Sequence, residues 1–288
     1  MTFDKTYEIS KRIVPPLEWE KFKSTLLLEW EHLLNNNLTE ENDFQKFLET
    51  NPCMIPGAYG SSLTSGHAPI YASVFSQPVL PGFKTKKPDF MWIATCSCEL
   101  NPMLLEIEDP KKKWFTKRGQ PTAQFTQAYN QLNEWRVWFA NPTNIHIFIE
   151  TYKINSTRAD GRQIVPHYVL IYGRRSEVED KKIKRAVNKK TDETIMTYDR
   201  LSPSSDQSNY LCIKIKKSNF VAITFPPTAR IGPNIIKEWI GIDNIDSSIR
   251  NSSLLSKERK KFLLKRIPYW KEWAKNKSKG SINTGDWE

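Results

Sequence analysis

The chain has 288 residues, with 43 Lys and Arg against 32 Asp and Glu, which gives a formal net charge of +11. This balance points to a polyanionic partner, with an anionic membrane surface as the alternative. No apolar run approaches the roughly 18 residues that span a bilayer, and the first residues lack an apolar signal segment. Four cysteines are too few for a disulfide framework. These features argue against a membrane-spanning or disulfide-rich secreted protein and predict a cytoplasmic one.

The first part of the chain, residues 1–38, is expected to form an arm followed by a helix. A short strand is expected in the arm, around Ile13. An amphipathic helix is predicted over Leu17–Asn35, because apolar side chains recur there at steps of three and four residues. These side chains, which we expect to pack on the core, are Trp19, Phe22, Leu26, Trp30 and Leu33.

A second helix is predicted over Glu40–Thr50, with Thr39 as its cap. Glu41 and Gln45 are four residues apart and therefore neighbours on its surface. A polar pair of this kind is ordinarily a solvated face. The alternative is that it belongs to a functional site.

The middle of the chain carries the most informative pattern. Residues 56–87 are rich in Gly, Ser and Pro and are expected to form a long loop with one strand at Ile70–Phe75. A hairpin of two strands, Asp89–Thr95 and Met103–Glu108, follows it. Each is a short apolar run bounded by turn residues, which is typical of buried strands.

Two carboxylates interrupt the second strand of this hairpin. Because alternate side chains of a strand share a face, Glu106 and Glu108 are expected to point to the same side. Burying ionised carboxylates is costly unless a cation, a metal or good hydrogen bonds compensate. A divalent metal could supply the positive charge, as could the basic side chains directly downstream. Those side chains are Lys111, Lys112, Lys113, Lys117 and Arg118.

A helix is predicted from Pro121-Thr122 to about Phe139, where a polar stripe lies beside an apolar seam. The stripe consists of Gln124, Gln127 and Gln131. Further strands are expected from the β-branched and aromatic content of four later segments. These segments are Ile145–Ile149, Val165–Tyr172, Thr194–Thr197 and Leu211–Ile215.

The C-terminal part, residues 226–277, is expected to be helical and basic. Helices are predicted over Pro233–Ile240 and Lys257–Asn276. From Lys257 to Lys279 ten basic residues face two acids and are interleaved with aromatic side chains. The last residues, 278–288, are expected to be disordered.

Two basic segments could contact nucleic acid, namely residues 173–190 and the C-terminal helix. A solvated helix explains either of them equally well, since Lys commonly serves only to keep a surface soluble. In the other interpretation their cations follow a phosphate backbone. The side chains expected to make such contacts are Arg174, Arg175, Lys257, Lys261, Lys265 and Arg266.

The order of short motifs along the chain resembles a known nuclease family. Pro88-Asp89, a strand, a turn, a strand with Glu-x-Glu, a basic loop and a helix resemble the PD-(D/E)xK phosphodiesterase core. The fuller string is similar to the Shedu nucleases of bacterial anti-phage defence, over roughly residues 40 to 275. The matching positions are Glu41-x-x-x-Gln45, Asn51-Pro52, Pro88-Asp89-Phe90, Leu105-Glu106-Ile107-Glu108, Phe115-Thr116-Lys117, Gln131 with Trp135, Tyr172-Gly173-Arg174-Arg175, Thr197-Tyr198-Asp199 and Arg266-Ile267-Pro268-Tyr269-Trp270.

The resemblance implies an α/β fold, a mixed sheet flanked by helices, for a core over residues 39–225. It further implies a DNA endonuclease that uses Mg²⁺ or Mn²⁺, acts against phage or other foreign DNA, and forms homo-oligomers. By the same analogy the metal ligands are Asp89, Glu106 and the carbonyl of Ile107, with Glu41 as an outer member. Gln131 would support the catalytic strand.

One departure from the wider superfamily matters, because Glu108 stands where that superfamily has Lys. By the resemblance, Glu108 acts as an extra ligand or base and Lys117, or one of Lys111, Lys112 and Lys113, restores the missing charge. The alternative is a catalytically inactive module that keeps the nuclease fold and binds or senses DNA. An acidic cluster near lysines is expected in both cases.

Overall fold

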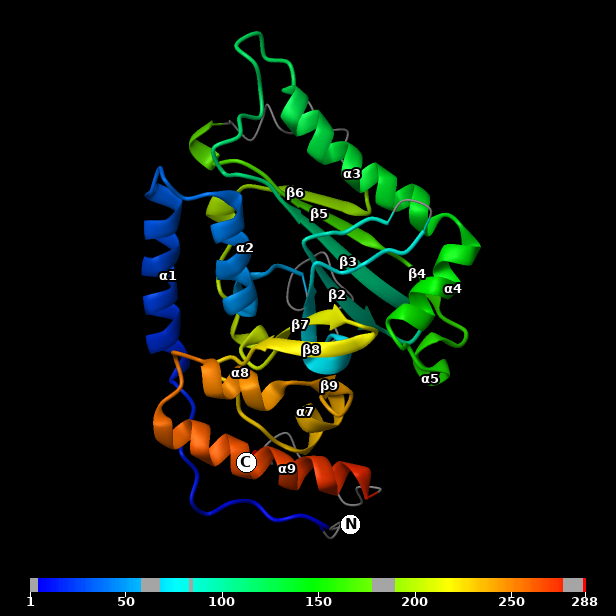
Figure 1. Cartoon of the computed structure of the whole chain (residues 1–288). Coiled ribbons are helices and arrows are strands. Elements are labelled where there is room, and N and C mark those ends of the chain that lie inside the picture. Colours follow the sequence, from blue (N-terminus) through cyan, green and yellow to red (C-terminus); the bar gives the residue numbers. More distant parts are fainter. Residues whose placement is uncertain (1–4, 58–67, 83–84, 178–189, 277–286) are drawn as a thin grey trace.

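The computed structural model describes residues 5–57, 68–82, 85–177, 190–276 and 287–288 (Figure 1). Within these residues the centre of the molecule is a mixed sheet of nine strands, in the order β6-β5-β3-β2-β1-β7-β8-β9, with β4 paired to β3. The strands are β1 (Ser73–Ser76), β2 (Phe90–Thr95), β3 (Glu99–Ile107), β4 (Gln163–Ile164), β5 (His167–Ile171), β6 (Glu193–Met196), β7 (Leu211–Lys216), β8 (Asn219–Thr224) and β9 (Ile242–Asp243).

The connections of the sheet identify its type. β1, β2 and β3 form an antiparallel meander, after which β5 pairs with β3 and β6 pairs with β5, both in parallel. Parallel neighbours need a crossover connection, and α3 (Ala123–Phe139) lies between β3 and β5 in the chain. The result is the mixed sheet flanked by helices that the sequence predicts, so the predicted fold class is confirmed.

Helices cover the sheet and close one end of it. In Figure 1 α1 and α2 lie at the left, α3 and α4 at the upper right, and α7, α8 and α9 below the sheet. Trp30 of α1 packs on α2, since its ring centroid lies 5.7 Å from that of Phe44. The helices are α1 (Trp19–Asn35), α2 (Glu41–Thr50), α4 (Pro142–Thr151), α5 (Ser156–Ala159), α7 (Pro233–Glu238), α8 (Ile245–Asn251) and α9 (Lys257–Lys275).

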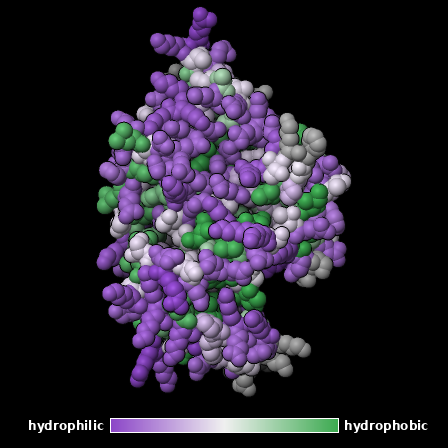
Figure 2. Space-filling model, in the orientation of Figure 1, coloured by the Kyte–Doolittle hydropathy of each residue, from purple (hydrophilic) through white to green (hydrophobic). Residues whose placement is uncertain are grey.

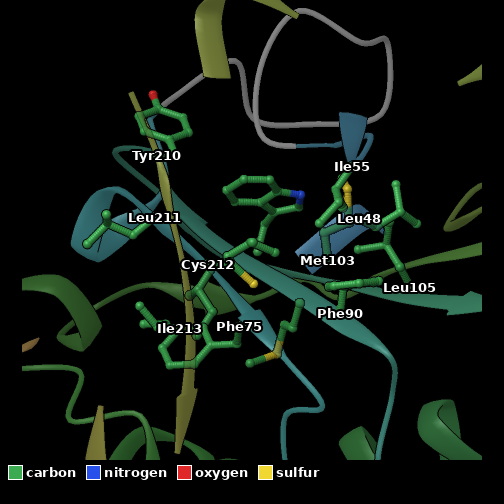
Figure 3. Packing of buried hydrophobic residues seen from close by; sticks show 14 of the residues in the cluster. Leu48, Ile55, Phe75, Phe90, Met103, Leu105, Tyr210, Leu211, Cys212 and Ile213 are labelled. Carbon is green, nitrogen blue, oxygen red and sulfur yellow. The ribbon is translucent and has the colours of Figure 1, made fainter. Parts of the chain in front are cut away.

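Apolar side chains of α2 and of the segment after it pack on one face of the central hairpin. Figure 3 shows Leu48 of α2 and Ile55 together with Met103 and Leu105 of β3. Because side chains alternate along a strand, Glu106 points to the other face of β3. Apolar packing on one face therefore fixes the strand that presents a carboxylate on the other.

Two predicted strands are wrong. Ile145–Ile149 lies inside the helix α4, because Asn141 caps that helix by accepting a hydrogen bond from the N–H of Thr143 at 2.9 Å and Pro142 occupies its first turn. These capping residues outweigh the β-branched content of the segment. Around Ile13 the arm has no regular secondary structure.

The arm and the chain end pack on the C-terminal helix. Tyr7 contacts Trp270 and Trp273 of α9, with ring centroids 5.2 Å and 5.1 Å away. Glu288 is buried and pairs with Arg259, so the expected disorder does not extend to the final residues 287–288. Residues 278–286 of the expected tail lie outside the described residues. Among the described helices none is long and apolar enough to cross a membrane.

Candidate functional site

Asp89 and Glu106 face each other across the central hairpin. The β2–β3 register pairs Phe90 with Leu105, which places Asp89 directly opposite Glu106. The backbone N–H of Asp89 donates to the carbonyl of Leu105 at 3.0 Å. The N–H of Ile107 donates to Oδ2 of Asp89 at 2.8 Å. Strand pairing thus holds both carboxylates in one place.

This pair of carboxylates is electrostatically unsatisfied. Burial raises the pKa of Asp89 to about 7, against the lowering effect of the Ile107 N–H, and Glu41 and Glu108 raise it further. Burial and the neighbouring Asp89 raise the pKa of Glu106 well above its ordinary value, although a hydrogen bond from Gln131 lowers it. Glu106 is only 8% exposed, and its Oε2 has no hydrogen-bond partner among the residues that the structure describes. A cation bound here would offset both the burial of the two carboxylates and the missing hydrogen bond of Glu106.

Glu108 lies in a second group of charges at the end of β3. The ammonium of Lys112 contacts the carboxylate of Glu108 and lies 3.3 Å from Oε2 of Glu41. Glu41 also accepts a hydrogen bond from the N–H of Asp109 at 3.0 Å. Burial raises the pKa of Glu108 and Lys112 partly offsets this. The first turn of α2 therefore contacts the segment that directly follows β3.

The structure also separates the lysines that sequence reasoning left open. Lys112 is the one that contacts Glu108, whereas Lys111 donates to the carbonyls of Asn37 and Thr39 at 2.7 Å and 2.6 Å. Lys117 is exposed on a turn in the loop that joins β3 to α3, at the top of Figure 1. It forms no ion pair with any residue that the structure describes.

A close backbone approach fixes the segment that carries Lys112. Gly173 has φ of +59°, and a Cβ there would lie 2.6 Å from Nε1 of Trp114 and 3.0 Å from the carbonyl oxygen of Lys112. Only Gly fits this position without displacing the ring or the backbone. Gly173, although distant from Lys112 in the sequence, thus helps to position it by direct contact with its backbone.

Gln131 reaches the site from α3, which ion pairs fix against the sheet. Arg136 of this helix donates to both carboxylate oxygens of Asp192, at 2.8 Å and 3.0 Å, and contacts the fully buried Glu193. Trp135 is buried against the sheet, with its ring centroid 6.5 Å from that of Tyr168. These contacts fix α3 on the sheet in the position that places Gln131 next to Glu106.

The residues expected to contact DNA are placed in three different ways. Arg174 is partly buried and donates to Asp199 and to the carbonyl of Leu34, both at 2.9 Å, whereas Arg175 is exposed. Residues 178–189 of the same basic segment lie outside the described residues. Arg266 is 7% exposed and donates to the backbone carbonyls of Glu8 and Glu288, so it serves the interior.

Exposed lysines gather along the N-terminal half of α9. They border a shallow hollow of about 560 Å³. The surface near the lower left of Figure 2, where α9 begins, is hydrophilic. In Figure 1 α9 lies below the sheet, whereas the first turn of α2 is at the upper end of that helix, away from α9. The hollow is lined by Arg250, Lys257, Lys260, Lys261, Leu264 and Lys265.

The family to which the chain belongs follows from its sequence. The family described as Shedu protein SduA, C-terminal, matches residues 38–202, which is more than half of the chain. The chain belongs to the Shedu family. No curated protein matches it.

The Shedu match implies a defence nuclease domain and covers Glu41, Asp89, Glu106 and Glu108. The match ends before β7, so the strands β7, β8 and β9 and the C-terminal helices lie outside it. Within the Shedu segment, Tyr172-Gly173 and Tyr198-Asp199 are joined, since the N–H of Tyr198 donates to the carbonyl of Gly173 at 3.2 Å.

The Shedu site offers few side-chain ligands to a metal. No cluster of three or more His, Cys, Asp or Glu that could hold an ion occurs among the described residues. Mg²⁺ is commonly bound by one or two carboxylates, with waters and substrate oxygens completing its shell. Asp89 and Glu106 supply two carboxylates, and Oε2 of Glu106 has no hydrogen bond to any described residue, so the pair fits that requirement.

Sequence reasoning missed one polar cluster beside the site. Glu49 of α2 accepts from Lys214 of β7 at 2.8 Å and from Gln45 at 3.2 Å, and also bonds to Ser76. Burial raises the pKa of Glu49, but these hydrogen bonds outweigh it and leave that pKa lowered. The Glu41–Gln45–Glu49 spacing on α2 was the available signal, whereas its partners come from distant segments.

Proposed function

We propose that this Shedu protein is a metal-dependent DNA endonuclease that acts in the cytoplasm against phage or other foreign DNA. The observation that carries the proposal is that the buried Oε2 of Glu106, opposite Asp89, has no hydrogen bond to any described residue. Two carboxylates whose pKa values are both raised form a site that favours a divalent cation. The family membership supplies the reaction class. Homo-oligomerisation is a further expectation from the family.

Asp89 and Glu106 would hold Mg²⁺ or Mn²⁺, with the carbonyl of Ile107 as a further ligand and Glu41 in an outer position. Such an ion, when bound, lowers the pKa of a water and neutralises charge on the phosphate. Gln131, whose side chain lowers the pKa of Glu106, would orient that carboxylate. Asp89 directly precedes β2, and the other three side chains, Glu106, Glu41 and Gln131, come from β3, α2 and α3, so the intact fold is needed to assemble them.

Glu108 and Lys112 divide the work that a single Lys performs in the wider superfamily. The Glu108 carboxylate, whose pKa burial raises, accepts the proton of the attacking water. The ammonium of Lys112 lies next to it and supplies positive charge to the phosphate. In this proposal Lys117 is not needed for catalysis.

The exposed cations of α9 contact the DNA backbone, together with Arg175. Lys257, Lys261 and Lys265 are one helical turn apart and line one hollow. Replacing Lys261 and Lys265 by Gln should flatten the salt dependence of DNA binding by about 0.9 in log-log slope for each phosphate that the protein no longer neutralises. An unchanged slope would assign α9 to packing alone.

The test is plasmid cleavage in Mg²⁺ or Mn²⁺ by the wild type and by Glu106→Gln. Activity should fall by at least about 100-fold in the variant, because the neutral amide of Gln binds a divalent ion more weakly than the carboxylate does. Protection from thermal unfolding by Mn²⁺ should disappear with it. Glu99→Gln, at the other end of β3, is the matched control and should keep both properties.

Cleavage that survives in Glu106→Gln would place the reaction elsewhere. A folded wild type that binds DNA but never cleaves it would favour the inactive DNA-binding module. That outcome has a physical basis in the contact of Lys112 with Glu108 and Glu41, which leaves its charge largely compensated.

A further inference from the structure

A cleft of about 830 Å³ lies between α3 and residues 85–87, the segment that leads into β2. It is lined mainly by polar side chains, and the buried Trp135 also reaches its wall. In Figure 2 the surface around α3 is mostly hydrophilic. The lining residues used below are Lys86, Lys87, Gln127, Asn130, Gln131 and Glu134.

Gln131 and the chain next to Lys87 connect the cleft with the proposed catalytic centre. Gln131 lines it and also lowers the pKa of Glu106, and Asp89 lies two residues after Lys87, directly before β2. Two contacts join α3 to the segment that precedes β2. Nε1 of Trp138 donates to the carbonyl of Pro81 at 2.9 Å, and Lys86 forms an ion pair with Glu134. The walls are therefore fixed relative to each other and to the carboxylates.

Three polar groups in the cleft are left without a protein partner. Gln127 and Asn130 are exposed, and their side chains form no hydrogen bond within the described residues. Lys87 forms no ion pair with those residues. The two amides, three residues apart, lie on the same side of α3 with a rise of about 4.5 Å between them.

This combination suits nucleotides. Asn and Gln side chains pair in a bidentate manner with the N6 and N7 edge of adenine, and an ammonium suits a phosphate. A volume of about 830 Å³ is that of a small-ligand site and is too small for a duplex. The chemistry therefore fits one or two unpaired nucleotides of a single strand.

We propose that the cleft receives unpaired nucleotides next to the scissile phosphate and that Gln127 and Asn130 favour adenine there. Lys87 contacts a phosphate of the same strand. The inference rests on the proposed endonuclease function, because it takes the cleft as the continuation of that centre. It makes Gln127 and Asn130 determinants of specificity rather than catalytic residues.

The experiment measures binding, so that cleavage does not obscure it. Glu106→Gln protein in Mg²⁺ is titrated against labelled duplexes that carry a short unpaired tail of adenines or of thymines, and against a blunt duplex. The adenine tail should bind about 5- to 100-fold tighter than the thymine tail, which is the discrimination expected of one bidentate pair. Adding Gln127→Ala and Asn130→Ala should abolish this preference and leave the affinity for the blunt duplex unchanged.

Gln124→Ala is the matched control, because Gln124 is exposed on the same helix but does not line the cleft. Circular dichroism checks that all variants fold. Equal affinity for both tails, or a preference that survives the double substitution or disappears in Gln124→Ala, overturns the inference and leaves the nuclease proposal standing. Absence of binding to all three DNAs overturns both.

Discussion

Replacing Asp89 by Asn should stabilise the metal-free protein, although it removes a proposed ligand. Asn keeps an oxygen that can accept the N–H of Ile107, which lies 2.8 Å from Oδ2 in the wild type. It removes a charge that is disfavoured by burial and by the carboxylates of Glu41 and Glu108. Stability and metal binding should therefore change in opposite directions.

The magnitude follows from the pKa of Asp89, which rises from 3.8 to about 7. At about 1.4 kcal/mol per pH unit, this corresponds to about 4 kcal/mol. The raised pKa means that the folded state disfavours the ionised form. The cost is therefore absent below pH 4, grows between pH 4 and pH 7, and is complete above pH 7. Because part of the side chain reaches water and Glu106 remains, we expect a gain of about 2 to 4 kcal/mol at pH 8.

The assay is urea unfolding in EDTA, followed by the fluorescence of the ten tryptophans. The free energy of unfolding of the variant should exceed that of the wild type at pH 8, and the difference should approach zero at pH 4. Saturating Mn²⁺ should stabilise the wild type and not the variant. Glu29→Gln, an exposed carboxylate of α1, is the control and should show no such dependence.

A variant that is less stable than the wild type at pH 8 would refute this reasoning. A stability difference that does not change with pH would refute it as well.

Three further outcomes are expected. Lys112→Met should lower DNA cleavage by about 10²- to 10³-fold, whereas Lys117→Met should leave it nearly unchanged. The reverse result would show that Lys117, and not the lysine in contact with Glu108, supplies the positive charge in catalysis. Gly173→Ala should lower the free energy of unfolding by about 2 to 4 kcal/mol, measured by urea unfolding, because φ is +59° and the new methyl would meet Trp114. Arg266→Ala should destabilise by about 2 kcal/mol or more while leaving the salt slope of DNA binding unchanged, since its bonds are internal.

The carboxylate pair could be predicted from sequence because it depends on local rules. Strand alternation sets the face of Glu106, and a short hairpin has only a few registers that pair apolar residues. The motif at Pro88-Asp89 then brings the second carboxylate into position. No distant contact is needed for either step.

The partner of Glu108 could not be predicted in the same way. Lys111, Lys112 and Lys113 follow one another in a loop, and their directions depend on Trp114 packing against Gly173, about sixty residues later. The failure at Ile145–Ile149 has a different cause, because the cap at Asn141 and Pro142 decides the structure against the residue preferences. The cleft beside α3 could not be predicted either, because its second wall, residues 85–87, comes from a segment that is distant in the sequence.

The position of α9 imposes a length scale on any DNA that touches both ends of this molecule. α1, which runs along the side of the molecule between the two regions in Figure 1, has 17 residues and is therefore about 25 Å long. At about 3.4 Å per base pair, a duplex needs roughly seven or eight pairs to cover that span. Under the proposed function the fold would act as a ruler, because DNA shorter than this would reach the carboxylate site or the exposed lysines of α9, but not both in one protomer.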